Sequence, residues 1–237
     1  SPVIYMKQNV VVVYGQNLQG NLIDRIEGLV EGHELTINID RPKDTTTEAV
    51  GTYGNSFGTW GSATITCGDE DVTANYENAT TKRGSYIVVP ATAPEVTFVN
   101  AEARTYGDDL SADYTFNFAE AGYNDKYVLE VSGVPTYVDA GFYTFKVADG
   151  QIVAIKDGQD AFALDYVVYA AKDASKADLK SNFAGLTVSG AWEVAKRDVS
   201  ITSSGSFRTY NGSPLTVNTV IYTPFTGTAH FLDGEEP

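Results

Sequence analysis

The groups in this sequence with the most evident chemical potential are acidic side chains gathered in short clusters. Carboxylates in turns could supply oxygen ligands to Ca²⁺, and two carboxylates facing each other across a cleft could act as the acid–base pair of a glycosidase. The clusters lack the spacing of an EF-hand loop and share no aromatic flanks that would hold a sugar. We therefore expect solvated turns, no enzyme activity and no catalytic residues, with Ca²⁺ as the one candidate cofactor. The clusters are Asp69-Glu70-Asp71, Asp108-Asp109, and Asp233 with Glu235 and Glu236.

The histidines and the single cysteine do not combine into a reactive group. His33 and His230 are the only histidines, and neither has a cysteine or a second histidine close by in sequence, which argues against a zinc site. Cys67 is the only cysteine, so no disulfide can form within the chain. It ends the strand-like stretch Ala63-Thr-Ile-Thr-Cys67, where a cysteine is typical of a small apolar strand residue and not of a nucleophile. Phosphate-loop, dinucleotide and nucleophile-elbow motifs do not occur.

Aromatic side chains offer a different chemistry, the stacking of sugar rings. The chain holds 15 tyrosines, and Trp60 lies in the loop Gly58-Thr-Trp60-Gly61. Tyrosine is also a good strand former, so we expect most of these rings to be structural. Trp60 is then the candidate contact for a host glycan.

The charge of the chain argues against nucleic acid as a partner, and its short apolar runs argue against membrane insertion. The chain has 31 acidic and 16 basic residues, a net charge of −15. Nucleic acid requires clustered Lys and Arg, and no such cluster exists. No apolar run approaches the roughly 18 residues of a membrane span, so we expect no membrane insertion. Ser1-Pro2, followed at once by strand-like sequence, indicates a processed or trimmed N-terminus.

The elements that must position these groups are short β-strands. Helical periodicity is almost absent, whereas runs rich in Val, Ile, Thr and Tyr recur between clusters of Gly, Asn and Asp. The sequence therefore predicts an all-β fold. In the first part of the chain the predicted strands cover 3–6, 9–14, 34–39, 62–67 and 85–89.

Three landmarks occur twice in the same order, which predicts a tandem repeat of about 105 residues. The first is Tyr-Gly-x-x-Leu, the second an acidic residue shortly before Gly-x-Tyr, and the third Asp-x-x-x-Asn-aromatic. We expect a first β repeat at 1–93, a second at 94–196 and a partial third at 197–237, with Pro90–Pro94 as the first linker. The two copies of the first landmark begin at Tyr14 and Tyr106, and those of the second end at Tyr53 and Tyr143. The two copies of the third landmark cover 71–76 and 178–183.

The second copy is longer than the first. Gly51 and Asp71 are 20 positions apart, whereas Gly141 and Asp178 are 37 apart. The extra residues contain Asp149-Gly150 and Asp157-Gly158, both favourable hairpin turns. Phe162, Leu164, Tyr166 and Val168 then alternate along one face, so the sequence predicts an inserted β-hairpin.

The aromatic residues of the landmarks have predicted structural roles. We expect Tyr76 and Phe183 to be core residues, each beside a turn in which Asn75 or Asn182 caps local backbone groups. Tyr53 and Tyr143 should act like the tyrosine corner of sandwich domains, in which the ring is buried and the hydroxyl bonds to the backbone.

These landmarks, together with Ile26-Glu-Gly28-Leu-Val-Glu-Gly32-His33, resemble the MBG-type repeats of bacterial surface proteins. The second copy departs from the pattern through its inserted hairpin and through Leu-Lys-Ser in place of Val-Thr-Ala. The resemblance implies immunoglobulin-like β-sandwich modules in large secreted or wall-attached chains. It brings no functional residues to carry over.

The third copy stops before its later landmarks, so its strands would lack partners. We expect Val199–Phe231 to pair with residues outside its own repeat, either the inserted hairpin or a second copy of the chain. Strand exchange at 198–237 would then make the protein self-associate. The apolar face in question contains Val217, Val220, Ile221, Phe225 and Phe231.

Taken together, the sequence predicts a non-catalytic structural or interaction module of a bacterial cell-surface or secreted protein, such as a stalk, an adhesin or a self-assembling filament subunit. The alternative is a carbohydrate- or mucin-binding module that uses Trp60.

Overall fold

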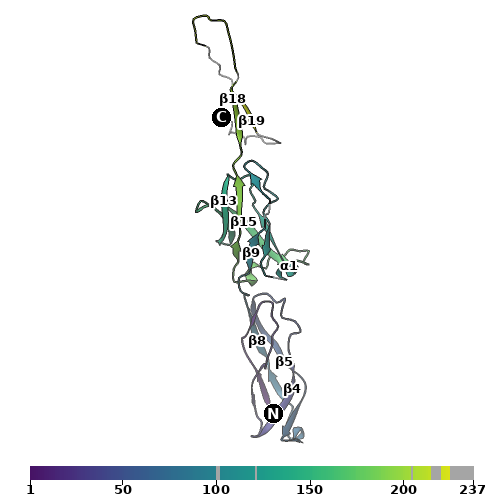
Figure 1. The fold of residues 1–237 in the computed structure, drawn as a ribbon. Helices are drawn as coiled ribbons and strands as arrows, with labels where there is room; N and C mark the ends of the chain where they lie inside the picture. Colours follow the sequence, from purple (N-terminus) through teal and green to yellow (C-terminus); the bar gives the residue numbers. More distant parts are fainter. Residues whose placement is uncertain (100–101, 121, 204, 215–219, 225–237) are drawn as a thin grey trace. The chain divides into compact units, whose positions relative to one another are not determined.

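The computed structural model describes residues 1–99, 102–120, 122–203, 205–214 and 220–224. Among these residues, nearly all regular structure is β-strand, so the all-β prediction is confirmed. The helical part consists of α1 (Tyr123–Lys126) and two 3₁₀ turns, and no described helix is long and apolar enough to cross a membrane. The chain divides into two compact units (Figure 1). Unit 1 contains Ser1–Ala93 and Asp178–Gly185, and unit 2 contains Pro94–Ala177 and Leu186–Pro237.

Unit 1 consists of two sheets. In the smaller one, the central strand β1 is antiparallel to β3 and parallel to β7. In the larger one, β2 is parallel to β8, and the long strand β5 is antiparallel to both β8 and β4. The strands are β1 (Val3–Met6), β2 (Val10–Val13), β3 (Ile23–Glu27), β4 (His33–Asp40), β5 (Gly51–Cys67), β6 (Glu70–Asp71), β7 (Thr80–Lys82) and β8 (Gly84–Val89).

The core of unit 1 follows from the period-2 pattern of its strands. Ile4 on β1, Phe57 on β5 and Tyr86 on β8 are almost completely buried. β4 alternates half-buried and exposed positions along its full length, as predicted from its sequence. At Gly84, an added Cβ would lie 2.3 Å from the Phe57 ring, so this close contact between β8 and β5 requires glycine.

Unit 2 repeats this pattern of strand directions with one addition. In its smaller sheet, β9 is antiparallel to β11 and parallel to β16. In its larger sheet, β10 is parallel to β17, which is antiparallel to β13. The strands are β9 (Glu95–Phe98), β10 (Arg104–Thr105), β11 (Phe116–Phe118), β12 (Tyr127–Ser132), β13 (Gly141–Ala148), β14 (Gln151–Lys156), β15 (Gln159–Ala170), β16 (Thr187–Ser189) and β17 (Ala191–Ala195).

The addition is the inserted hairpin, which confirms the prediction. Asp149-Gly150 joins β13 to β14 and Asp157-Gly158 joins β14 to β15, and all four residues have positive φ. This conformation matches the twist of the flanking strands. In unit 1, the single strand β5 pairs with both β8 and β4. In unit 2, β13 pairs with β17 and β15 pairs with β12, and β14 lies between β13 and β15.

The tyrosine-corner prediction is confirmed for the hydroxyl groups in both units. The Tyr53 hydroxyl donates to the Ala49 carbonyl at 2.8 Å, and the Tyr143 hydroxyl donates to the Asp139 carbonyl at 2.8 Å. Tyr143 is buried and Tyr53 is half-buried. Tyr53 stacks on Tyr86, and the Tyr143 ring lies 6.1 Å from that of Trp192, so each corner packs on an aromatic residue of the last strand of its larger sheet.

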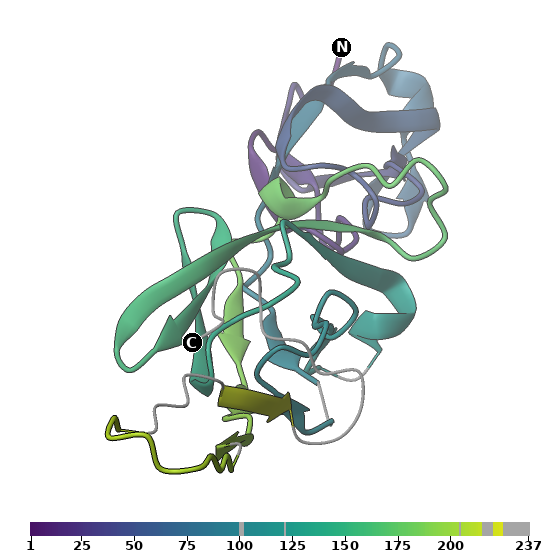
Figure 2. The same cartoon turned by 90° about the horizontal axis from the view of Figure 1, so that it is seen from above.

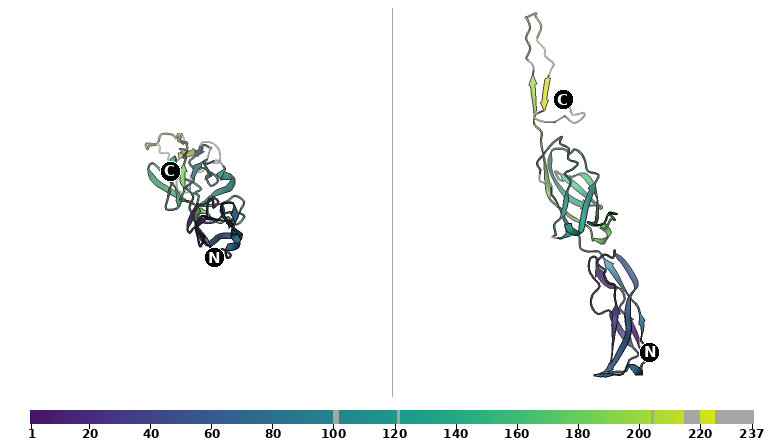
Figure 3. Two further views of the ribbon diagram at one scale, coloured as in Figure 1. Left: turned by 90° about the horizontal axis from the view of Figure 1, so that it is seen from below. Right: turned by 90° about the vertical axis from the view of Figure 1, so that its right-hand side faces the viewer.

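The described part of the third segment forms its own sheet. β18 (Val199–Ser203) pairs antiparallel with β19 (Val220–Pro224) (Figure 3). The prediction that these residues pair outside their own repeat is therefore wrong for β18 and β19, because two complementary strands in one segment can satisfy each other's backbone groups. Val217, Phe225, His230 and Phe231 lie outside the described residues, as do Asp233, Glu235 and Glu236.

Candidate functional site

The most unusual feature of unit 1 is a turn that comes from a distant part of the sequence. Residues 178–185 belong to unit 1, although the chain on both sides of them belongs to unit 2. Figure 2 shows this green segment beside the purple and blue strands of unit 1. We call Asp178–Phe183 the second turn. It contains the 3₁₀ turn η2 (Lys180–Asn182), and the Asp178 carboxylate accepts a hydrogen bond from the Lys180 N–H at 3.0 Å.

Asn182 and Phe183 hold the second turn in unit 1. Asn182 is 3% exposed, and its side-chain Oδ1 accepts a hydrogen bond from the Val50 N–H at 2.9 Å. Its carbonyl accepts a second hydrogen bond from the Ala91 N–H, and the Ala91 carbonyl accepts a third from the Ala184 N–H. Phe183 is 6% exposed, and its ring meets the Tyr14 ring edge-on at 5.5 Å. These contacts complete the end of unit 1 where β2 and β8 terminate.

Phe183 is therefore buried as predicted, but in a different place. We expected it in the core of the second repeat, whereas its partners Tyr14 and Ala91 belong to the first. We expected the Asn182 side chain to cap its own turn, whereas its oxygen accepts the hydrogen bond of the Val50 N–H, 132 positions away. A buried amide and a buried aromatic ring are satisfied wherever they find a donor and an apolar surface.

Unit 1 contains a matching turn of its own, Asp71–Tyr76, which we call the first turn. Its 3₁₀ turn η1 (Thr73–Asn75) has nearly the same backbone as η2: the following residue has φ −120° and ψ 148° at Tyr76, against −119° and 151° at Phe183. The Asp71 carboxylate accepts hydrogen bonds from the Thr73 N–H at 2.8 Å and from the Thr73 hydroxyl, and these bonds lower the pKa of Asp71.

The surroundings of the two turns differ. Asn75 is exposed, and Tyr76 is half-buried, which is less deeply buried than Phe183. The Tyr76 hydroxyl lies 2.7 Å from His33 Nδ1 and accepts a hydrogen bond from the Val30 N–H at 3.1 Å. The Tyr76 ring is thus held within unit 1 by its hydroxyl group. Because a tyrosine hydroxyl needs water or a hydrogen-bond partner, the ring lies near the surface.

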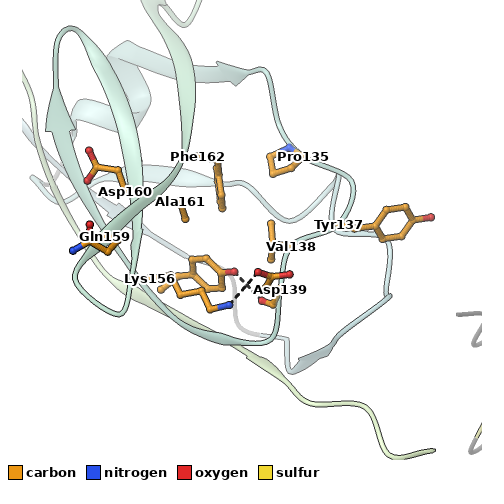
Figure 4. Close-up of a pocket in the computed structure, with 10 residues that line it drawn as sticks. Pro135, Tyr137, Val138, Asp139, Lys156, Gln159, Asp160, Ala161 and Phe162 are labelled. Atoms are coloured by element: carbon orange, nitrogen blue, oxygen red, sulfur yellow. Dashed lines mark hydrogen bonds and ion pairs between the residues drawn. The ribbon is translucent and has the colours of Figure 1, made fainter. Parts of the chain in front are cut away.

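Unit 2 has an open groove of about 420 Å³ between the loop before β13 and the turn region of β14 and β15 (Figure 4). Its charged groups are already paired: Lys156 Nζ lies 3.3 Å from Asp139, and Asp160 accepts a hydrogen bond from Lys146 at 2.6 Å. The Tyr137 ring points outward at the rim (Figure 4) and is exposed. The lining residues are Pro135, Tyr137, Val138, Asp139, Tyr143, Lys156, Gln159, Asp160, Ala161 and Phe162.

Tyr143 lines the groove with a hydroxyl that remains protonated. Burial raises the pKa of Tyr143 to about 12, with Asp139 and Asp157 adding to the effect, so its hydroxyl stays protonated at neutral pH. An aromatic rim beside amide and carboxylate groups is the kind of surface that contacts sugars.

The remaining candidates from the sequence do not assemble into a reactive site. Trp60 lies within the strand β5 and not in a loop as predicted, and it is 62% exposed, so it is available for contact. Cys67 ends β5 and is exposed. Asp108 pairs with Arg197, and Asp109 accepts hydrogen bonds from Ser111. Within the described residues, no three His, Cys, Asp or Glu side chains converge as a metal site would require.

Two surface aromatics were missed by the sequence analysis. Tyr137 and Phe142 are both about half exposed on unit 2. The signal for Tyr137 was its place in the turn-rich stretch 133–137, where a large ring has no strand periodicity to bury it. Comparisons of this chain with protein-family models, curated proteins and solved structures found no match.

Proposed function

We propose that this chain is a non-catalytic structural module of a bacterial cell-surface or secreted protein, in which consecutive immunoglobulin-like β-sandwich repeats form a stalk. The observation that carries the proposal is the seating of the second turn in unit 1. Because part of one repeat completes the end of the repeat before it, consecutive repeats are interlocked and do not merely share a linker.

The parallel strand patterns of the two units support the reading as repeats. Each unit has a small sheet with one parallel and one antiparallel pair, and a large sheet with a parallel edge pair. The resemblance of the landmarks to MBG-type surface repeats supports the extracellular setting. The net charge of −15 suits a solvated surface.

The interlock also supports a mechanical role. Removing the second turn from unit 1 would expose the Phe183 ring and break three hydrogen bonds, at a cost on the order of 5 kcal/mol. A stalk benefits because each junction resists separation beyond what a short flexible linker provides.

Single-molecule pulling of the full chain tests this role. We expect unit 1 to unfold at a lower force in Phe183→Ala than in the unsubstituted chain, whereas unit 2 should be unaffected. Equal unfolding forces of unit 1 in both chains would contradict the proposal. Protease treatment of intact source cells tests the location, because a surface protein should be removed without lysis.

A carbohydrate-binding module is the second candidate, favoured by the exposed Trp60 and by the groove beside Tyr137. A glycan array separates the two functions. Specific binding that is lost in Trp60→Ala or Tyr137→Ala but kept in Phe142→Ala would support lectin activity. The control residue Phe142 is an exposed aromatic that does not line the groove.

A further inference from the structure

The first turn and the second turn occupy the same position relative to their strands. Tyr76 and Phe183 each stand four positions before the strand that follows, which begins at Thr80 in β7 and at Thr187 in β16. The Thr80 N–H donates to the Pro2 carbonyl at 2.9 Å, and the Thr187 N–H donates to the Pro94 carbonyl at 3.0 Å. Pro2 therefore stands where Pro94 stands, and the two turns are equivalent surfaces of two equivalent domains.

The two turns differ in whether their asparagine has hydrogen-bond partners in the protein. Asn182 uses both its side-chain and its backbone oxygen as acceptors, for the N–H groups of Val50 and Ala91. Asn75 ends a 3₁₀ turn whose flanking residues have nearly the same backbone angles as those of η2, but Asn75 is exposed, and among the described residues no hydrogen bond to either of its oxygens is found.

We propose that the first turn is a docking surface for a further domain of the same kind, preceding Pro2 in the same polypeptide. This inference rests on the proposed function and extends it by naming the partner. The partner presents three groups at its end, as unit 1 does: an aromatic ring at the position of Tyr14, a free N–H at that of Val50, and an extended residue at that of Ala91.

The position of Pro2 explains why we expect the partner domain to belong to the same polypeptide. Ala91 lies three positions before Pro94, and from there it pairs with Asn182 and Ala184. A residue three positions before Pro2 would lie equally close to Asn75 and Glu77. The chain itself would therefore deliver the pairing residue, with no separate binding event.

The sequence differences between the turns do not oppose this docking. Phe183 becomes Tyr76, whose added hydroxyl is already bonded to Val30 and His33 within unit 1. Its ring can meet a partner's ring without burying an unpaired hydroxyl. Lys180 and Ser181 become Thr73 and Ala74, and neither Lys180 nor Ser181 is among the buried residues of the second turn.

Transplantation of the turn tests its competence in the full chain. Leu179→Val, Lys180→Thr and Ser181→Ala together give the second turn the sequence of the first between its aspartate and its asparagine, and Phe183 is kept because the groups that bond the Tyr76 hydroxyl lie beside the first turn. We expect the Val50 and Ala91 amides to keep their protection from hydrogen exchange. In Asn182→Ala, exchange at Val50 should accelerate by about tenfold or more. If the transplanted chain exchanges as fast as Asn182→Ala, the inference fails, whereas the interlock of the proposed function stands.

A duplicated chain tests the docking directly. An isotope-labelled copy of residues 1–93 is ligated ahead of Pro2, so that its Ala93 replaces Ser1 and the junction copies Ala93-Pro94. We expect the Val50 amide of the added copy to be protected, and Asn75→Ala in the original copy to accelerate its exchange by about tenfold. Asn78→Ala, at an exposed asparagine outside the turn, is the matched control.

Three results would overturn the inference. The first is an added copy that does not fold, and the second is a folded added copy whose Val50 exchanges freely. The third is a concentration-dependent dimer of the unduplicated chain that Asn75→Ala abolishes, since this would identify a second copy as the partner. If Asn182→Ala leaves the exchange of Val50 unchanged, the proposed function itself is wrong.

Discussion

Replacing Phe183 with alanine should destabilise unit 1, although the chain on both sides of residues 178–185 belongs to unit 2. The ring is 6% exposed and meets Tyr14, which is also buried. Removal of a buried phenylalanine costs about 3–5 kcal/mol, and this cost includes the loss of the edge-on contact with Tyr14. Because Phe183 sits at the end of unit 1 and not at its centre, we expect about 3 kcal/mol.

The two tryptophans allow the units to be followed separately. Trp60 belongs to unit 1, and Trp192, which is 3% exposed, belongs to unit 2. Urea unfolding of Phe183→Ala is therefore measured in a Trp192→Phe background for unit 1 and in a Trp60→Phe background for unit 2. With a urea dependence of about 1.5 kcal/mol per molar, the midpoint of unit 1 should fall by about 2 M.

The control is Phe142→Ala, which removes a phenylalanine that is 56% exposed and should change stability by less than about 0.5 kcal/mol. The reasoning is refuted if Phe183→Ala lowers the unit 2 transition and leaves unit 1 unchanged. That result would place the ring in the core of its own repeat.

Three further predictions concern single groups. Tyr143→Phe should cost about 0.5–1.5 kcal/mol by calorimetry, because it removes the hydroxyl that donates to Asp139, and an unchanged stability would show that this bond contributes nothing. Gly84→Ala should cost more than about 3 kcal/mol in urea unfolding, because the new methyl group meets the Phe57 ring and backbone at once, and a folded variant of normal stability would contradict this geometry. The hydroxyl and the N–H of Thr73 donate to the Asp71 carboxylate and lower its pKa below the ordinary value of 3.8. The ionised carboxylate therefore stabilises the folded state at pH values above 3.8, and this contribution is lost as the pH falls through the lower, folded-state pKa. Between about pH 2 and pH 5, the urea midpoint of Asp71→Asn should therefore vary less with pH than that of the unsubstituted chain, and equal pH dependence would count against the turn.

Much of the fold was predictable because it depends on local interactions. Alternation of half-buried and exposed residues in β4 follows from the two-residue period of a strand. Asp149-Gly150 and Asp157-Gly158 form hairpin turns because aspartate tolerates positive φ and glycine adopts it freely. The hydroxyl of Tyr143 reaches a carbonyl only four positions away.

The candidate site was predictable only in part. Trp60 could be singled out by residue type, but its place within β5 and its exposure are seen only in the structure. The groove beside Tyr137 could not, since its walls come from the loop before β13 and from β14 and β15. The pairing of β18 with β19 was missed for a similar reason, because an incomplete set of strands does not reveal which partner each one takes.

What the sequence determined by itself was the type of each element and the character of each position: strands, tight turns, and aromatic rings that require burial. The tertiary structure alone decided where the second turn belongs. Apolar character states that Phe183 must leave water, but the hydrophobic effect has no direction, and only the ring of Tyr14 and the N–H of Val50 select the place. Asn75 and Asn182 have the same local pattern, yet one is exposed and the other buried, because the burial of Asn182 depends on Val50, a neighbour 132 positions away.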